Sequence, residues 1–185
     1  MKIYFVGSAS VGKTTLCGYI RNKYELICLP ESARQILAEK EIPLDSLRAN
    51  FDLINQFQKD IFYRQIKEES REGSFISDRS LIDALAYTCQ HTSLFSELIN
   101  TKDCKDYIEG LRKPDVYIFF VRPHKSLMKQ DGIRETLDWE NINAIDAMIK
   151  MLLQLFNIRY FDIHTPSIQE RINLVESVLS THKPL

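Results

Sequence analysis

The residues with the clearest chemical meaning form one short segment near the start of the chain. Residues 7–14 read Gly-Ser-Ala-Ser-Val-Gly-Lys-Thr and match the pattern G-x-x-x-x-G-K-[ST], in which backbone N–H groups surround a phosphate. Gly7 and Gly12 allow the tight turn and the close approach of the backbone, because they carry no Cβ atom. A following helix would add the positive end of its dipole. The predicted nucleotide-binding residues are Gly7, Ser8, Ala9, Ser10, Val11, Gly12, Lys13, Thr14 and Thr15.

Two side chains of this segment indicate what it binds. The Lys13 ammonium is expected to reach the β- and γ-phosphates of a nucleotide as a point charge. The Thr14 hydroxyl is expected to bind Mg²⁺, which takes oxygen ligands and often binds substrate phosphates as well. The alternative is a glycine turn that happens to precede a lysine. The apolar residues 3–6 directly before the turn disfavour it, because they predict the buried strand that leads into a phosphate-binding loop. We therefore expect ATP and Mg²⁺ as cofactors.

The hydrophobic pattern predicts strands that alternate with helices along the whole chain. The expected strands span residues 2–6, 25–29, 74–78, 116–121 and 158–163. The expected helices span residues 13–24, 32–41, 51–72 and 81–88, two short segments within 93–113, and residues 138–156 and 165–180. We expect Thr165 as the N-cap of the last helix and Pro166 at its first position. This alternation is typical of an α/β fold, here a five-stranded parallel sheet with helices on both faces.

The sequence predicts how these elements are organised into domains. We find no linker in the sequence, so we expect residues 1–185 to form a single domain. A charged segment around residues 124–137 has little apolar periodicity, and we expect it to form a short lid.

Polar residues follow the predicted strands at the edge where ligands of open α/β sheets bind. These residues are Glu31 and Arg34 after the second strand, Asp78 and Arg79 at the end of the third, and Arg122 after the fourth. Asp78 is expected near Mg²⁺ or as a proton acceptor, and Arg79 on substrate phosphate or the transferred group. Glu31 is expected to bind an acceptor hydroxyl, and Arg34 to contact the substrate. The structural alternatives are an ion pair between Asp78 and Arg79, a helix cap by Glu31 and a solvated Arg34.

The predicted lid contains a candidate for transition-state stabilisation. Arg134 lies two residues after Gly132, and a flap that closes over ATP needs a flexible point and a cation for the developing charge. Lys125 and Lys129 are further cations of the same segment. The alternative is an ordinary solvated loop.

The predicted helix over residues 51–72 offers groups that could read a substrate. Gln56, Gln58 and Arg64 could face a nucleobase or a sugar, although glutamines on helices are usually solvated. We take Gln58 as the candidate for substrate binding.

The composition restricts the class of protein. A hydrophobic fraction of 44% and a charged fraction of 26% over 185 residues are ordinary for a globular protein. The net charge of −1 gives no overall attraction to nucleic acid or to an anionic membrane. The apolar run 116–121 is far shorter than the ~20 residues that cross a bilayer, and we find no signal-peptide pattern. We therefore expect a cytoplasmic protein without a membrane partner, and the sequence leaves a homodimer open.

The cysteines do not indicate a metal site. Cys17, Cys28, Cys89 and Cys104 show no C-x-x-C spacing and no nearby pair of histidines. We expect ordinary buried thiols in a reducing compartment and no zinc site.

Several runs resemble those of small-molecule kinases with a phosphate-binding loop. The runs Pro30–Arg34, Ser77–Ala84 and Asp131–Arg134 together resemble AAA-type small ATPases related to bacterial nicotinamide-riboside kinases. The triplet Asp-Arg-Ser at residues 78–80 resembles the Asp/Glu-Arg-Ser of deoxynucleoside kinases and the Asp-Arg of thymidylate kinases. Phe-Gln at residues 57–58 resembles part of the base-reading helix of deoxynucleoside kinases. The resemblance covers most of the chain.

The resemblance implies roles for three residues of this chain. It implies that Glu31 helps to activate an acceptor, that Arg79 contacts substrate or phosphate, and that Arg134 meets ATP. Nicotinamide-riboside kinases of the bacterial type usually have an acid-rich, threonine-bearing motif after the third strand, and the Asp-Arg-Ser at residues 78–80 differs from it.

The sequence therefore supports one main function and leaves alternatives open. The main hypothesis is an ATP- and Mg²⁺-dependent kinase that phosphorylates a nucleoside, a nucleotide or a related small metabolite. The alternatives are an ATP-binding regulatory switch without a small-molecule acceptor, and a nicotinamide-riboside kinase specifically. A GTPase is disfavoured, because Asp-x-x-Gly and Asn-Lys-x-Asp are missing after the third and fourth strands. A nucleic-acid kinase is a third alternative, against which the lack of a basic stripe with interleaved aromatic residues argues.

Overall fold

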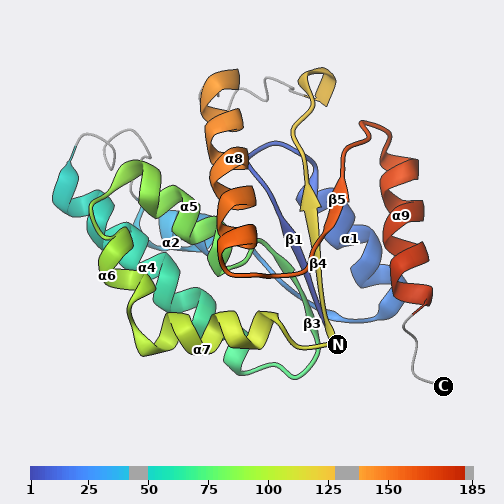
Figure 1. Ribbon diagram of the computed structural model, residues 1–185, viewed down its shortest axis with the longest axis horizontal. Helices are drawn as coiled ribbons and strands as arrows, with labels where there is room; N and C mark the ends of the chain where they lie inside the picture. Colours follow the sequence, from blue (N-terminus) through green and yellow to red (C-terminus); the bar gives the residue numbers. More distant parts are fainter. Residues whose placement is uncertain (42–49, 128–137, 182–185) are drawn as a thin grey trace.

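A parallel sheet forms the centre of the protein (Figure 1). The computed structural model describes residues 1–41, 50–127 and 138–181. The strands are β1 (Lys2–Val6), β2 (Ile27–Leu29), β3 (Phe75–Asp78), β4 (Val116–Val121) and β5 (Phe161–Ile163). They lie in the order β2-β3-β1-β4-β5, and every neighbouring pair is parallel. The expected five-stranded parallel sheet is therefore confirmed.

Helices cover both faces of the sheet, as expected (Figure 1). One face packs against α1 (Lys13–Tyr24) and α9 (Ile168–Ser180). The other face packs against a larger layer that consists of α2 (Ser32–Lys40), α4 (Phe51–Ser70), α5 (Leu81–His91), α6 (Phe95–Ile99), α7 (Lys102–Leu111) and α8 (Trp139–Leu155). A short 3₁₀ helix at Lys125–Leu127 follows β4.

The central strand β1 carries apolar residues on both faces, because each face lies under a helical layer. Tyr4 and Val6 belong to the core beneath the larger helical layer, whereas Ile3 and Phe5 belong to the core beneath α1 and α9. All four side chains are almost fully buried. A strand that is buried on both faces reads as a continuous hydrophobic run, which is the pattern that the sequence shows here.

The register of β1 and β3 determines where the predicted site residues lie. Phe5 of β1 is the partner of Asp78 of β3, and the Arg79 N–H donates to the Phe5 carbonyl with an N–O distance of 3.0 Å. The carboxyl ends of the two strands are therefore level. The loop that begins at Gly7 and the Asp78–Arg79 pair consequently lie at the same edge of the sheet.

The second and fifth strands are shorter than expected. The second begins at Ile27 rather than at Glu25, because Glu25 takes a left-handed conformation (φ 54°) and ends α1. The fifth begins at Phe161 rather than at Ile158, because the Ile158 N–H still donates to the Leu153 carbonyl at the end of α8.

The start of the last helix also differs from the prediction. The N-cap of α9 is Ser167, whose hydroxyl accepts a hydrogen bond from the Glu170 N–H. Thr165, the predicted N-cap, instead accepts from the Ser167 N–H, and Pro166 precedes the helix. The Thr165 side chain therefore shapes the loop before α9 and leaves the capping to Ser167.

Two other expectations concern the lid and the thiols. The predicted lid lies outside the described residues from position 128 to 137, and Arg134 and Lys129 lie within that gap. All four cysteines are free, but only Cys17 and Cys104 are buried, whereas Cys28 and Cys89 are partly exposed. Within the described residues, no helix has the length and hydrophobicity that a membrane span requires.

Candidate active site

The loop between β1 and α1 has the backbone geometry of an anion site. Gly7 has a φ of 148°, and a Cβ atom built there would lie 2.4 Å from the Val121 carbonyl oxygen. Gly12 has a φ of 92° and is the N-cap of α1, and no side chain caps the first N–H groups of that helix. Those N–H groups and the positive end of the helix dipole are therefore available to an anion.

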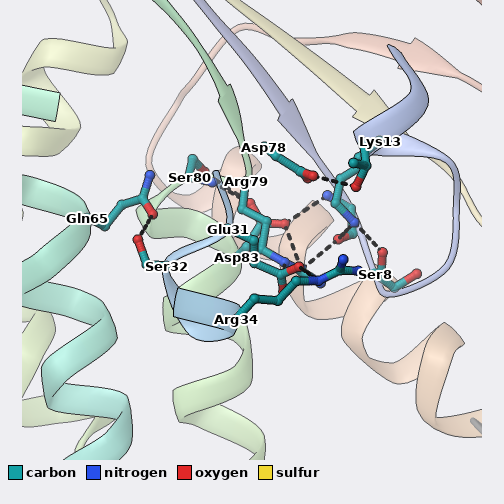
Figure 2. A network of polar contacts seen from close by, with 12 residues as sticks. Ser8, Lys13, Glu31, Ser32, Arg34, Gln65, Asp78, Arg79, Ser80 and Asp83 are labelled. Atoms are coloured by element: carbon teal, nitrogen blue, oxygen red, sulfur yellow. Dashed lines mark hydrogen bonds and ion pairs between the residues drawn. The ribbon is translucent and has the colours of Figure 1, made fainter. Parts of the chain in front are cut away.

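The Lys13 side chain forms hydrogen bonds with the backbone of this loop. Its side chain is buried, and its ammonium donates to the Gly7 carbonyl at 2.9 Å and to the Ser8 carbonyl at 2.5 Å (Figure 2). Burial, together with the nearby charge of Arg79, lowers the pKa of Lys13 to about 8. The partners of the Lys13 ammonium are neutral carbonyls here. A move to a phosphate would be favourable, because a cation binds an anionic acceptor more strongly than a neutral one.

Thr14 and Asp78 offer oxygen ligands side by side. The Thr14 hydroxyl donates to Asp78 Oδ2 with an oxygen–oxygen distance of 2.5 Å, so the two predicted Mg²⁺ ligands are brought together. A hydroxyl and a carboxylate are oxygen donors of the kind that Mg²⁺ binds, with phosphates and water completing the octahedron. The pair fits the expected ion, and Thr14 and Asp78 would hold it.

Arg79 connects the loop to the second strand. Its Nε donates to Glu31 Oε1 at 2.7 Å, and its Nη1 donates to the Gly7 carbonyl at 3.2 Å (Figure 2). Its guanidinium also lies over the Tyr87 ring, 5.2 Å from the centroid. The backbone φ of Arg79 is 91°, an unfavourable value for a residue with a side chain, and such strain often occurs at functional sites. The structural alternative, an ion pair between Asp78 and Arg79, is not among the contacts of the described residues, where Arg79 pairs with Glu31 and Asp83.

Glu31 holds two arginines. Its Oε1 accepts from Arg79, and its Oε2 pairs with the Arg34 Nε at 2.9 Å. Burial alone would raise the pKa of Glu31, but Arg79, Lys13 and Arg34 outweigh it and keep the pKa below its usual value. Glu31 is also the N-cap residue of α2, but its side chain forms no capping hydrogen bond. The structure thus favours a charge-pairing role over the capping alternative. Arg34 is more than half exposed.

Asp83 is a site residue to which the sequence analysis assigned no role. It is fully buried, and its Oδ1 accepts from the Gly7 N–H at 2.9 Å. Its Oδ2 accepts from the Ser80 N–H at 2.9 Å, and Ser80 in turn caps α5 in a capping box. The spacing Ser-x-x-Asp at residues 80–83 is the signal that predicts this box. Asp83 therefore fixes the first peptide of the loop to the start of α5.

The three candidates on α4 have different surroundings. Gln56 and Arg64 lie on the outer side of the helix, where Gln56 donates to Asp60 and Arg64 forms two hydrogen bonds with Glu39. Gln56 is exposed, which favours its solvated alternative, whereas Arg64 is partly buried and paired with Glu39. Gln58 is buried, and its Oε1 has no hydrogen-bond partner among the described residues. Gln58 thus offers an unpaired amide oxygen.

Another residue of α4, Gln65, reaches the start of α2 and the third strand instead. Its Oε1 accepts from the Ser32 hydroxyl at 2.9 Å (Figure 2), and its Nε2 donates to the Ser77 hydroxyl at 3.1 Å. Gln65 thus fixes the residues that directly follow Glu31 and precede Asp78. The sequence analysis missed Gln65, because only the packed structure shows which glutamine of the helix points inward.

Arg122, which directly follows β4, forms ion pairs with two neighbouring elements. Arg122 forms a bidentate ion pair with Asp146 of α8 and also approaches Asp162 of β5 at 3.7 Å. Lys125, a candidate from the predicted lid, lies with its ammonium 5.8 Å from the centre of the Trp139 ring. Arg122 therefore ties the end of β4 to α8 and β5.

Several solved structures resemble this protein in fold. A deoxyadenosine kinase from M. mycoides with the products dCMP and a flexible dCDP bound has 16% identity and a TM-score of 0.69, over 99% of this chain and 100% of that chain. A NadR protein in complex with NR has 19% identity and a TM-score of 0.71, over 95% of this chain and 50% of that one. A shikimate kinase from Acinetobacter baumannii in complex with shikimate has 14% identity and a TM-score of 0.54, over 99% of this chain and 95% of that chain. At these identities the similarity shows a common fold.

Sequence comparison identifies the family. A search of curated proteins gave no match. The family described as AAA domain matches residues 2–171, which include the loop at residues 7–14 and the residues gathered around it. This match spans more than half of the chain, and the protein therefore belongs to the AAA domain family.

Proposed function

We propose that the protein is a kinase that transfers the γ-phosphoryl group of ATP, with Mg²⁺, to a hydroxyl of a nucleoside, a nucleotide or a related small metabolite. The observation that carries this proposal is the contact chain from Glu31 through Arg79 to Gly7. This chain joins a buried carboxylate to the loop that would bind the phosphates. A phosphoryl-transfer site needs both parts within reach of each other.

The residues have distinct roles in the proposed reaction. The N–H groups of the loop and Lys13 bind the phosphates, and Thr14 and Asp78 would hold Mg²⁺. The metal ion, when bound, neutralises phosphate charge. Arg79 shifts its guanidinium from the Gly7 carbonyl to the transferred phosphoryl, where negative charge develops. Glu31 binds the acceptor hydroxyl and takes its proton as the new P–O bond forms and ADP leaves.

The acceptor is inferred to be a small molecule with at least one hydroxyl group. Gln58 supplies an unpaired amide oxygen for a polar group of that molecule. The similar structures are described as a deoxyadenosine kinase, a NadR protein with NR and a shikimate kinase with shikimate. Their variety supports a small hydroxyl-bearing acceptor and leaves open which one, including nicotinamide riboside.

A panel of acceptors tests the proposal. The protein is incubated with Mg·ATP and with nucleosides, nucleotides, nicotinamide riboside or shikimate, and the ADP that depends on the acceptor is measured. Glu31→Gln is the control, because it keeps the shape of the side chain and removes its basicity. Turnover with one acceptor class that Glu31→Gln abolishes supports the proposal. ATP binding with no turnover for any acceptor would favour the alternative, a nucleotide-binding switch.

A further inference from the structure

A second arginine contacts the loop, at Val11. Arg171 is in the first turn of α9, and only 1% of its surface is exposed. Its Nε donates to the Thr165 carbonyl at 2.6 Å, and its Nη1 donates to the Val11 carbonyl within the loop. Its Nη2 is buried and has no hydrogen-bond partner among the described residues.

Arg171 has no counter-charge in the part of the chain that the structure describes. Its contacts there are to two neutral carbonyls, and burial lowers its pKa below the usual value. The positive ends of the α1 and α9 dipoles add more positive potential at this place. A buried charge without a partner destabilises a protein, so a compensating anion is expected when the protein functions.

The contact with Val11 also fixes one peptide of the loop. The peptide between Val11 and Gly12 is trans, so its C=O and N–H point in opposite directions. Because Arg171 Nη1 binds the Val11 oxygen, the Gly12 N–H points away from Arg171. A Cβ atom at Gly12 would lie 3.2 Å from Arg171 Nη1, which gives a second reason for glycine at this position.

We propose that Arg171 is a positioning residue for the triphosphate of the nucleotide and that the bound triphosphate is its counter-charge. This inference rests on the proposed function and adds to it a residue from the last helix. Arg171 acts through the Val11–Gly12 peptide and through its positive charge behind the loop. In the free protein, the uncompensated charge of Arg171 raises the free energy. Binding of ATP removes this penalty, and the gain contributes to the free energy of binding.

Two substitutions at Arg171 and one control elsewhere test the inference. Arg171→Gln removes the charge and retains two N–H donors, whereas Arg171→Lys retains the charge. The control Lys23→Gln also removes one positive charge at the contact between α1 and α9, because Lys23 pairs with Glu176. It lies ten residues after Lys13 in α1, which is about 15 Å along the helix. ATP affinity is measured by calorimetry, and the thermal midpoint is measured with and without ATP.

The expected ATP affinity of each variant depends on whether it keeps the positive charge at position 171. Arg171→Gln should weaken ATP binding by about tenfold or more, because the bound triphosphate loses its buried counter-charge. The ATP-induced rise of its thermal midpoint should shrink accordingly. Arg171→Lys should bind ATP within about threefold of the wild type, and Lys23→Gln should bind like the wild type.

Three results would overturn the inference. The first is wild-type ATP affinity in Arg171→Gln. The second is an equal loss of ATP affinity in both Arg171 variants, with equally lowered midpoints in the free protein, which would indicate a structural role only. If Arg171→Gln does not fold, Arg171→Lys decides alone, and a loss of about tenfold there overturns the inference. A wild-type protein that binds no ATP would instead refute the proposed function, and the inference with it.

Discussion

Two guanidinium groups, those of Arg79 and Arg171, contact the same loop, and they differ in what neutralises their charge. Arg79 contacts two carboxylates, Glu31 and Asp83, and these acids outweigh burial and keep its pKa well above the usual value. Arg171 contacts two carbonyls, and burial lowers its pKa. Arg79 is thus compensated before any ligand binds, whereas Arg171 has no carboxylate partner within the described residues.

The difference separates two tasks of a phosphate site. A compensated guanidinium can exchange one partner for another during a reaction at little net cost, which suits a group that meets charge only in the transition state. An uncompensated guanidinium gains as soon as an anion arrives, which suits ground-state binding. We therefore expect Arg79 to control the rate and Arg171 to control nucleotide affinity.

The largest effect is expected for Arg79→Met. It removes the cation that we propose meets the transferred phosphoryl, so kcat should fall by about a thousandfold, while the dissociation constant for ATP changes by less than about threefold. Steady-state kinetics with the acceptor found in the panel and calorimetry with ATP measure the two quantities. The substitution also leaves Glu31 and Asp83 without their common partner, so a thermal melt must show that the variant is folded.

The matched variant Arg171→Gln should show the opposite division, with weaker ATP binding and little change in kcat at saturating ATP. If both arginine variants lose affinity and rate in the same proportion, the two guanidinium groups share one task, and the comparison fails.

The next effect is expected for Glu31→Gln. Loss of the base should lower kcat by about a hundredfold, within the usual range for general acid–base catalysis. Arg79 would also lose a charged partner, so the double variant Glu31→Gln with Arg79→Met should lose less than the sum of the two single free-energy changes. A double-mutant cycle on kcat measures this coupling. Fully additive losses would contradict the view that Glu31 and Arg79 act as a unit.

The sequence predicted the surroundings of Arg79 better than those of Arg171. Glu31, Asp78 and Arg79 are found because they follow predicted strands, and parallel strands bring their carboxyl ends to one edge. The motif at residues 7–14 likewise has a fixed spacing. These features are local, so a linear pattern can carry them.

Arg171 and Gln65 could not be predicted in the same way. Arg171 shares the buried face of α9 with Val175 and Leu179, and the spacing i, i+4, i+8 indicates only that it points inward. Arg171 contacts Val11, which lies 160 residues earlier in the chain. This contact depends on how α9 packs on the sheet. Gln65 is one of several glutamines on α4, and its contacts with Ser32 and Ser77 depend on three elements together. These contacts join residues that are far apart in the sequence, so they form only when the elements pack together.

A pH titration examines Lys13, the third cation that contacts the loop. Lys13 has a pKa of about 8 in the free protein, where Arg79, Asp78, Asp83 and Glu31 surround it. Phosphate binds its protonated form and raises this pKa. Affinity for ATP should therefore be constant below a pH of about 8 and fall by up to about tenfold per pH unit above it. Calorimetry between about pH 7 and pH 10 measures the change.

The control for this titration is Lys13→Arg, which stays protonated and should lose the pH dependence even if its affinity is weaker. Cys28→Ser is a second control, because a hydrogen bond with Cys17 lowers the pKa of the Cys28 thiol to about 7. A fall in affinity that persists in Lys13→Arg would show that another group titrates.

The smallest effect is expected for Arg34→Ala. Arg34 pairs with the same carboxylate as Arg79, but 54% of its side chain is exposed, so solvent screens the pair. Its removal should change kcat by less than about threefold and stability by less than about 1 kcal/mol. Kinetics and a thermal melt measure both. A loss near that of Arg79→Met would mean that Arg34 contacts the acceptor directly, and burial would then be the wrong criterion for ranking the partners of Glu31.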